Sequence, residues 1–508
     1  MKRIGVALVA AAAILPYLRS LDGGFLSDDP LLIVLNENIH SLERPWRFFT
    51  DPETLSYKGS LHSYRPVRTL LFAVEWALFG ERAWAFRIVS VLLHAGVAVL
   101  LLAWLRRLGV PEAGAVLASC LFAVHPVAVE AVAWVSIQGD LVMAGAMIGA
   151  LLLLEGDADD QRLGRLLAAV GLFLLALGGK EAAVILPGLL VVRRLWPMGS
   201  RRGPSLRAIG TLGAVAIGYL ILRGTLVAES AHRPWSGGSR WTTYGAVVLA
   251  TNYYAGAVLF PVNLTFRWQP PPGPPANAVE WGLTAIGAAI LIALVVAAVA
   301  GRTQRPVVAG ALAMLLLALA PSANLAFPLP TVSELRYLYL PLAFVALAVA
   351  PLLGRAPRAA TIALLVLMAT FAARRALDWT SPRALWTAAM ERPRSSDEAL
   401  IALAKVAANE TLDSAAVDPP SLAESSHYLL RYLAERDLSV MHPNEPSDIG
   451  GLAGYLRSRL ERAGRSAEAE RIRELVLGRW YPILHDAGLE AQAEALKEAF
   501  EAHDRRGR

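Results

Sequence analysis

Residues 85–107, AFRIVSVLLHAGVAVLLLAWLRR, form an apolar run that ends in two arginines. A transmembrane helix needs roughly 17 to 25 predominantly apolar residues, so residues 85–105 are predicted to span a membrane. Cytoplasmic loops carry an excess of lysine and arginine. Arg106 and Arg107 therefore predict a cytoplasmic end for this helix, which sets the direction of the chain on either side of it.

Further apolar runs of comparable length follow the same pattern, and arginines separate many of them. They lie near residues 4–19, 112–133, 139–154, 163–178, 182–197, 207–225, 279–300, 306–321, 336–353 and 358–374. With a cytoplasmic N-terminus, every arginine-rich loop falls on the cytoplasmic side. The sequence thus predicts a polytopic helical bundle of about 11 spans. The first run also fits a signal peptide, but a retained span is the preferred interpretation.

The apolar segment 241–262 interrupts this alternation, because a full crossing would move every later arginine-bearing loop to the outside. It begins with Thr242-Thr243-Tyr244 and contains Asn252-Tyr253-Tyr254. Aromatic and polar tips of this kind are typical of helices at the level of the lipid headgroups. We therefore predict an interfacial or re-entrant segment here, and an extracytoplasmic C-terminal region.

The overall composition agrees with a membrane protein. The chain of 508 residues is 55% apolar and 18% charged, whereas charged residues approach a quarter of soluble proteins. The net charge of +6 comes from short basic clusters between apolar runs, which does not favour nucleic acid as a partner. The single cysteine, Cys120, excludes an intramolecular disulfide. The richness in Ala, Leu and Arg favours a bacterial inner membrane.

The chain is predicted to have two domains. Residues 1–377 contain the apolar runs, and residues 378–508 alternate apolar and charged positions with helical spacing. The second domain is predicted to be small, soluble and all-helical. Residues 384–404 are spaced like a tetratricopeptide helix pair, although a 34-residue period does not continue after them.

The long external loop of residues 20–84 contains the adjacent acids Asp28 and Asp29 directly after the first span. One carboxylate could act as a general base on an acceptor hydroxyl while the other orients a group or a divalent cation, Mg²⁺ or Mn²⁺. The alternative interpretation is a helix cap in a solvated loop.

Other ionisable residues lie within the predicted spans or at their ends, where charge is usually functional. They are His94, His125, Glu130, Asp140, Lys180, Glu181, Glu334 and Arg336. Snorkelling could explain Lys180 and Arg336, and His94 favours a packed helix interface. The topology nevertheless brings the acids and bases to one face. Lys and Arg beside an apolar region suit the phosphate of a lipid-linked substrate.

At these residues the chain resembles the C-type glycosyltransferases, and most closely the transmembrane and tetratricopeptide-repeat family of O-mannosyltransferase-like proteins. The resemblance extends over about residues 20 to 405. It rests on Asp28-Asp29 with Asn36, Ser63-Tyr64-Arg65-Pro66, His94, Phe122 to Val127 with Glu130 to Trp134, Gly139-Asp140-Leu141, Lys180-Glu181, and Glu334-Leu335-Arg336-Tyr337 through Pro341. The arginine usual before the Asp140 position is replaced by Gln138-Gly139.

The resemblance implies an enzyme that takes a sugar from a polyprenyl-phosphate carrier and passes it, with inversion, to an acceptor hydroxyl on the extracytoplasmic face. Asp28 or Asp29 would be the base, and Lys180 and Arg336 would hold the carrier phosphate. Substrate-binding residues implied in the same way are Tyr64, Arg65, His125, Glu130, Asp140, Glu181, Glu334 and Tyr337. The acceptor stays open between protein, lipid and glycan.

Two other classes of protein fit the sequence less well than a glycosyltransferase does. A transporter or flippase of lipid-linked glycans tends to show inverted repeats and charges near the bilayer midplane, which this sequence lacks. A non-catalytic scaffold with a partner-binding tail would not need so many spans.

Overall fold

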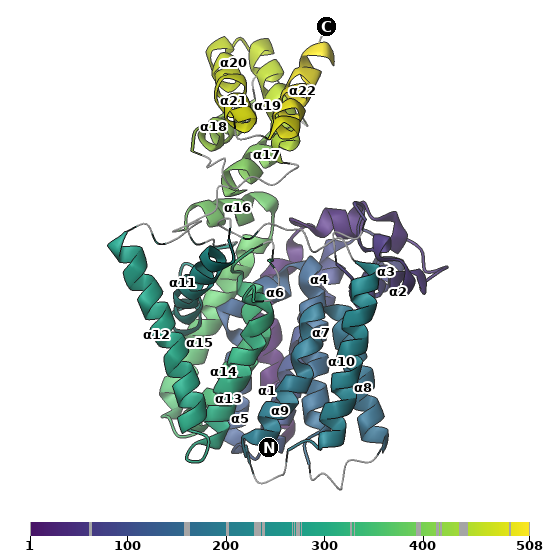
Figure 1. The fold of residues 1–508 in the computed structure, drawn as a ribbon, viewed down its shortest axis with the longest axis vertical. Coiled ribbons are helices and arrows are strands. Elements are labelled where there is room, and N and C mark those ends of the chain that lie inside the picture. Colours follow the sequence, from purple (N-terminus) through teal and green to yellow (C-terminus); the bar gives the residue numbers. More distant parts are fainter. Residues whose placement is uncertain are drawn as a thin grey trace. The chain divides into compact units, whose positions relative to one another are not determined.

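In the computed structural model the chain is all-helical, and no β-strand occurs among the residues that the structure describes (Figure 1). The predicted fold class is therefore confirmed. The described residues are 2–59, 63–156, 163–199, 203–227, 235, 239–266, 268, 270, 275, 277–325, 328–329, 331–392, 398–412, 416, 419–435, 445–486 and 489–506.

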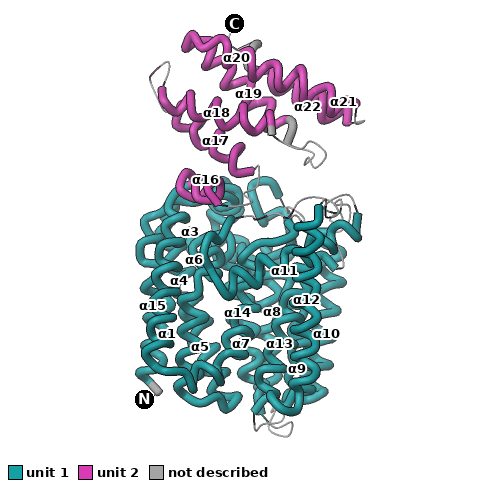
Figure 2. The backbone as a smooth tube through the Cα atoms, turned by 90° about the vertical axis from the view of Figure 1, so that its left-hand side faces the viewer, with its two compact units in different colours: residues 1–266, 273–381 teal, residues 267–272, 382–508 magenta. Residues whose placement is uncertain are grey.

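The chain divides into two compact units, shown in different colours in Figure 2. Unit 1 consists of residues 1–266 and 273–381, and unit 2 of residues 267–272 and 382–508. The division at Ser381 lies close to residue 377, where the apolar runs of the sequence end.

Unit 1 contains all of the long apolar helices. Its α-helices are α1 (Lys2–Ile14), α2 (Arg47–Thr50), α3 (Pro66–Phe79), α4 (Ala83–Arg107), α5 (Glu112–Val124), α6 (Val129–Ala133), α7 (Gln138–Leu153), α8 (Leu163–Gly179), α9 (Leu186–Leu195), α10 (Leu206–Leu226), α11 (Arg240–Leu259), α12 (Ala278–Ala300), α13 (Pro306–Leu319), α14 (Tyr339–Leu353) and α15 (Arg358–Ala376). Each predicted apolar run coincides with at least one of these helices.

Seven helices of the described part are long and apolar enough to cross a membrane, or eight if one bent pair counts as a span. They are Arg3–Asp22, Ala83–Arg107, Val135–Leu153, Leu206–Leu226, Ala278–Ala300, Leu335–Leu353 and Arg358–Trp379, and the bent pair is Glu112–Val124 with Pro126–Ala133. The predicted number of about 11 spans is not confirmed. Helix α9 has only 10 residues, and the apolar helices Leu163–Gly179 and Pro306–Ser322 lie at the lower limit of the length that a bilayer requires.

The arginine-bearing ends of several helices meet at one end of unit 1, which we call the basic end. Gly5 of α1 lies against the Arg106 side chain at the end of α4. Arg302, after α12, donates a hydrogen bond to the Leu195 carbonyl at the end of α9 (2.8 Å). The N-terminus of α1 lies at this end in both views (Figures 1 and 2). Arginines that the sequence assigns to the same side of the membrane therefore also lie at the same end of the folded bundle.

A buried ion pair stands at the basic end. The Arg193 guanidinium of α9 donates two hydrogen bonds of 2.7 Å to the carboxylate of Glu155, just after α7. Both side chains are only 1% exposed. The indole N–H of Trp104 in α4 donates to the same carboxylate (3.2 Å). Three helices are therefore joined through one acid.

Helix α11 coincides with most of the apolar segment 241–262, which is predicted not to cross the membrane. Its Asn252 amide donates to the Leu283 carbonyl in the first turns of α12 (2.7 Å), and its Tyr244 hydroxyl donates to the Leu325 carbonyl (3.0 Å). Helix α11 is not among the seven span candidates of the described part. It packs beside the beginning of α12, whose other end reaches the basic end.

Unit 2 is a helical domain with its own apolar core (Figure 2). Its α-helices are α16 (Pro382–Met390), α17 (Glu398–Leu412), α18 (Pro420–Glu435), α19 (Glu445–Arg462), α20 (Ser466–Arg473), α21 (Tyr481–Asp486) and α22 (Glu490–Arg506). Trp480 is fully buried in this core, and its indole N–H donates to the Leu433 carbonyl (2.8 Å). A tetratricopeptide array is not confirmed.

Candidate functional site

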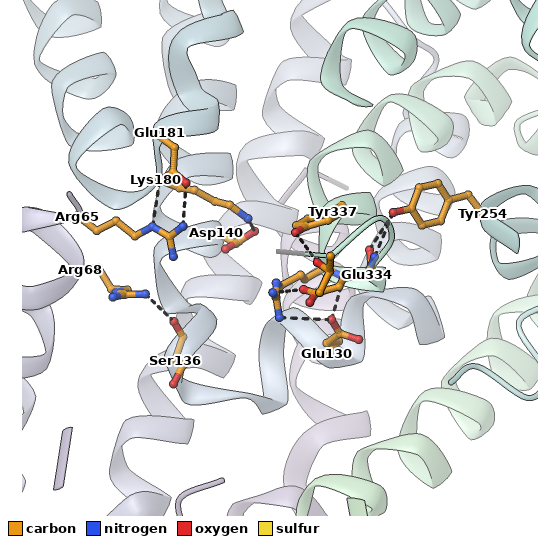
Figure 3. Close-up of polar contacts among 12 residues, drawn as sticks. Arg65, Arg68, Glu130, Ser136, Asp140, Lys180, Glu181, Tyr254, Glu334 and Tyr337 are labelled. Carbon is orange, nitrogen blue, oxygen red and sulfur yellow. Dashed lines mark hydrogen bonds and ion pairs between the residues drawn. The ribbon is translucent and has the colours of Figure 1, made fainter. Parts of the chain in front are cut away.

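The polar residues predicted to act together lie where the helices of unit 1 break. Pro126 follows His125 and ends α5, because a proline cannot continue the helical hydrogen bonds. Lys180 is extended after α8 and before the short helix Glu181–Ile185. Glu334 is extended before the short helix Leu335–Leu338. Figure 3 shows the side chains of Lys180 and Glu334 from two of these breaks in one cluster with Glu130 of α6.

The two acids of the first loop have different environments. Asp29 is fully buried. Its carboxylate accepts hydrogen bonds from the backbone N–H of Leu26 (2.8 Å) and of Ser136 (2.8 Å), and from the Ser136 hydroxyl. Burial raises the pKa of Asp29 to about 6, although these hydrogen bonds and Arg87 oppose the rise. Asp29 therefore fastens the first loop to the segment before α7.

Asp28 is only partly buried. It follows Ser27, whose φ of 51° lies in the left-handed region and turns the chain sharply. The Asp28 carbonyl accepts the N–H of Leu32 (3.1 Å). Its carboxylate interacts electrostatically with Arg68 of α3. Of the two acids, Asp28 is thus the more exposed, whereas Asp29 is fully buried.

Two ion pairs form the centre of the cluster. The Lys180 ammonium lies 2.5 Å from Asp140 Oδ1, and Arg65 binds Glu181 in a fork, with contacts of 3.0 and 2.8 Å. Burial lowers the pKa of Lys180, which Asp140 partly offsets. For Glu181, burial alone would raise the pKa, but Arg65 outweighs it and the pKa falls. Arg65 and Glu181 are about a quarter exposed, so the cluster is reachable.

Close backbone contact brings these pairs together. A Cβ atom on Gly139 would lie 2.5 Å from the Gly179 carbonyl oxygen, a distance that side chains do not tolerate. Glycine at position 139 therefore permits the start of α7 to touch the end of α8. Asp140 and Lys180 are the next residues along each chain segment, which explains why they meet.

A second group of charges surrounds Glu130, which is fully buried in α6. Its carboxylate accepts the backbone N–H of Arg336 (3.3 Å) and lies 4.0 Å from the Arg336 guanidinium and 3.9 Å from that of Arg375. The Arg336 side chain also pairs with Glu334. A buried acid between two arginines holds the Glu334–Arg336 segment against α6.

The ring of Tyr337 joins the two groups. Lys180 Nζ lies 5.4 Å from the ring centroid, and Arg336 Cζ lies 5.6 Å from it. Arg336 also lies over Trp134, at 4.9 Å. These distances are typical of cation–π contacts. Lys180 and Arg336 are therefore neighbours, although 156 residues separate them in the sequence (336 − 180).

Tyr64 and His125 contact backbone groups. The Tyr64 hydroxyl donates to the Phe49 carbonyl (2.7 Å). His125 Nδ1 accepts the N–H of Val127 (3.2 Å), so Nε2 carries the proton and donates to the Val258 carbonyl of α11 (3.0 Å). Both contacts position loops. The role of Tyr64 and His125 in substrate binding stays a prediction.

Gln138 stands where the resemblance expects an arginine. Its amide donates to Glu75 Oε1 of α3 (2.9 Å), to the Phe86 carbonyl (2.9 Å) and to the Ser90 hydroxyl (3.1 Å). Glu75 is 2% exposed, and burial raises its pKa to about 8. Gln138 is therefore part of a buried polar contact between α3, α4 and α7.

Sequence reasoning missed four residues of this cluster, namely Arg68, Ser136, Tyr254 and Arg375. The Tyr254 hydroxyl of α11 accepts the N–H of Glu334 (3.1 Å) and donates to its carbonyl (3.4 Å), as Figure 3 shows. Serine, tyrosine and arginine are common residues at helix ends. The sequence marks Tyr254 only as part of a headgroup-level helix, and no local pattern marks any of the four as a site residue, because their partners lie far away along the chain.

A divalent cation does not fit the acidic pair by itself. The Asp29 oxygens accept three hydrogen bonds from the protein. Within the described part of the chain, no group of three or more His, Cys, Asp or Glu residues suits a metal ion. Calcium and magnesium usually need several oxygen ligands. The predicted Mg²⁺ or Mn²⁺ stays a prediction.

The fold and this cluster define an all-helical integral membrane protein whose acids, bases and aromatic rings meet at one end of a helical bundle. No family model matches the chain. It is 27% identical over 401 residues to Protein O-mannosyl-transferase TMTC4 of Homo sapiens, covering 66% of this chain and 53% of that protein. It is 35% identical over 129 residues to Protein O-mannosyl-transferase TMTC2 of Mus musculus, covering 25% and 15%.

These relatives confirm the resemblance to the O-mannosyltransferase-like family. The chain spans about half the length of the human relative, 53%. Among solved structures, it is similar to ArnT from Cupriavidus metallidurans bound to undecaprenyl phosphate (TM-score 0.38, 16% identity, 98% of this chain and 77% of that one). It is also similar to the Archaeoglobus fulgidus oligosaccharyltransferase in the apo form (TM-score 0.39, 12% identity, 84% and 59%).

Proposed function

We propose that this protein is a membrane glycosyltransferase that moves a sugar from a polyprenyl-phosphate carrier to an acceptor hydroxyl. The observation that carries the proposal is the pair of cations, Lys180 and Arg336, that flank the Tyr337 ring in one cluster of acids and bases. A leaving phosphate needs positive charge beside it as its bond to the sugar breaks. The O-mannosyl-transferase relatives support the same reaction class.

In the proposed reaction, the acceptor hydroxyl gives its proton to Asp28, and its oxygen forms a bond to the anomeric carbon of the sugar. The bond between that carbon and the phosphate oxygen breaks, and the carrier phosphate leaves as an anion beside Lys180 and Arg336. A single displacement of this kind inverts the anomeric configuration. Asp28 is favoured over Asp29 as the base because Asp28 is partly exposed, whereas Asp29 is fully buried and accepts hydrogen bonds from Leu26 and Ser136.

The proposed substrate-binding residues follow from the ion pairs. Asp140 and Glu334 orient Lys180 and Arg336 until the phosphate arrives, and Arg65 with Glu181 borders the cluster. A cation bound to a carboxylate keeps part of its charge for a further anion. The acceptor stays open between protein, lipid and glycan, and the relatives favour protein.

We also propose an orientation. The basic end gathers Arg106, Arg193 and Arg302, and the positive-inside rule assigns such an end to the cytoplasm. The charged cluster lies at the opposite end of the bundle and would face the extracytoplasmic side, in a bacterial inner membrane by the composition of the chain. The C-terminal unit is proposed to lie on the same side.

Reporter fusions test the orientation. A reporter enzyme that is active only outside the cytoplasm should be active when fused after Arg508 or inserted into the first loop at Arg44. It should be inactive when inserted at Thr303, in the loop after α12. An active reporter at Thr303 would reverse the proposed orientation.

Reconstitution tests the function against its rival, a flippase of lipid-linked glycans. The full chain in liposomes, supplied with polyprenyl-phosphate mannose, should release polyprenyl phosphate and glycosylate a serine- and threonine-containing peptide. A flippase would move the lipid across the bilayer without breaking the sugar–phosphate bond. A scaffold would do neither. Movement of intact donor without product would contradict the proposal.

A further inference from the structure

The side chain of Arg68 is a buried cation, and the protein provides few hydrogen-bond partners for its guanidinium. Arg68 is 4% exposed. Its one hydrogen bond runs from Nη1 to the Ser136 carbonyl and is long, at 3.4 Å. Its Nε atom is buried without a hydrogen-bond partner. Among the described residues no carboxylate forms an ion pair with it, and its Cζ atom lies 5.6 Å from the centroid of the Phe72 ring.

Two other buried arginines show how this chain satisfies a guanidinium when the role is structural. Arg87 is fully buried, and it donates to two carbonyls, those of Ser20 and Gly24. Arg193 is 1% exposed and binds Glu155 with two hydrogen bonds of 2.7 Å. Burying a charge without such partners costs several kcal/mol. Arg68 therefore differs from the structural arginines, and a cost of this kind is usually offset by function.

The position of Arg68 continues a row of cations. Arg336 interacts electrostatically with Lys180, Lys180 with Arg65, and Arg65 with Arg68. The first three each have a carboxylate partner within 3 Å, namely Glu334, Asp140 and Glu181. At the end of the row, Arg68 has no such partner in the described part of the chain. Arg68 is thus the one cation of this row that forms no ion pair with a carboxylate among the described residues.

The guanidinium of Arg68 lies beside the charged residues of the cluster. Its Cδ atom packs beside Gly139, where a Cβ atom would lie 3.3 Å away. Its guanidinium interacts electrostatically with Glu181, with Asp28, the proposed base, and with Asp140, the partner of Lys180. Figure 3 shows it beside Ser136 and Arg65. Burial and the neighbouring Arg65 lower the pKa of Arg68 to about 9, which a bound anion would reverse.

We infer that Arg68 is an anion-binding residue of this site and that its ligand is a phosphate oxyanion, supplied by the headgroup of the polyprenyl-phosphate carrier. The inference rests on the proposed function for the source of the phosphate. A guanidinium grips phosphate oxygens with two parallel hydrogen bonds, and Nε with a terminal nitrogen offers such a fork here. A ligand on Arg68 needs to displace no carboxylate, unlike one on Lys180 or Arg336.

Binding to the purified full chain tests the inference. The unfolding temperature in detergent is measured at increasing concentrations of inorganic phosphate, polyprenyl phosphate or acetate. A ligand that binds the folded state raises this temperature. Phosphate and polyprenyl phosphate should stabilise the wild type, and Arg68→Gln should bind them about 10- to 100-fold more weakly, as expected when charge-assisted hydrogen bonds are lost. Arg68→Lys should be intermediate, because lysine keeps the charge without the fork.

Arg47→Gln is the matched control, because Arg47 lies in the same loop but is half exposed and pairs with Asp51. It should bind like the wild type. Without ligand, Arg68→Gln should unfold no lower than the wild type, since no ion pair is lost. A lower unfolding temperature together with unchanged ligand binding would make Arg68 structural and overturn the inference. Equal stabilisation by acetate would overturn the phosphate assignment.

The same measurements separate this inference from the proposed function. If polyprenyl phosphate binds the wild type and Arg68→Gln equally, the role of Arg68 is refuted and the carrier donor still stands. If inorganic phosphate binds through Arg68 and polyprenyl phosphate does not bind, the anion site stands. The lipid carrier of the proposed function then fails.

Discussion

Asp28→Asn should lower sugar transfer by about 10²- to 10⁴-fold, the usual contribution of a general base. Asparagine has nearly the same shape but cannot take a proton from the acceptor. Asp28 is partly exposed, and its backbone carbonyl, which binds Leu32, is unchanged by the substitution. The variant should therefore fold normally. The measurement is product formation from a polyprenyl-phosphate sugar, with the unfolding temperature recorded alongside.

Asp29→Asn supplies the matched comparison. Both Asp29 oxygens accept hydrogen bonds from N–H or O–H donors, and the amide nitrogen of asparagine cannot accept one. A buried donor such as the Leu26 N–H would lose its partner, at a cost of about 1–3 kcal/mol. Asp29→Asn should thus lower the unfolding temperature, while Asp28→Asn should not. Full transfer activity in Asp28→Asn would exclude Asp28 as the base.

Arg193→Met should lower the free energy of unfolding by about 3–5 kcal/mol, the usual effect of removing one partner from a buried ion pair. Both side chains of the pair are 1% exposed, so solvent cannot compensate the Glu155 charge that remains. The double variant Glu155→Leu with Arg193→Met should recover most of the loss, because no buried charge is then left without a partner. The measurement is thermal or denaturant unfolding in detergent.

Arg302→Gln is the control for this experiment. Arg302 also lies at the basic end, but its contact with the Leu195 carbonyl is exposed to solvent. Its loss should change stability by at most about 0.5 kcal/mol, as is usual for surface substitutions. If Arg193→Met were as mild as Arg302→Gln, the pair would contribute little to folding. Sugar transfer, measured below the unfolding temperature, should be similar in all of these variants.

The sequence by itself predicted the membrane helices and the grouping of charges. Hydropathy and loop arginines are local signals, because a bilayer selects apolar segments one at a time and loop charge fixes their direction. The helices α4, α12 and α15 lie where the apolar runs predicted them. The predicted count of spans is not confirmed, because several predicted runs, such as 182–197 with its 10-residue helix α9, contain helices too short to be span candidates.

The same local signals placed the acids and bases of the cluster at one end of the bundle. The alternation of arginine-rich loops assigns Asp28, Asp140 and Lys180 to a common face before any contact is known. The short helix breaks at His125 and Glu334 follow from Pro126 and from the polar segment before α14. Which residues pair across these breaks is a different question.

Only the tertiary structure decided the partners. Asp28 and Asp29 are adjacent and alike in sequence, and they differ because Ser136, 107 residues away, encloses Asp29 alone. No sequence pattern distinguishes Arg68 from other arginines. Only the packing of α3 beside Gly139 shows that its guanidinium is buried with a single long hydrogen bond. Hydropathy and charge determine which segments enter the membrane and in which direction. Side-chain contacts between distant segments determine which of the charged residues are satisfied and which stay available for a substrate.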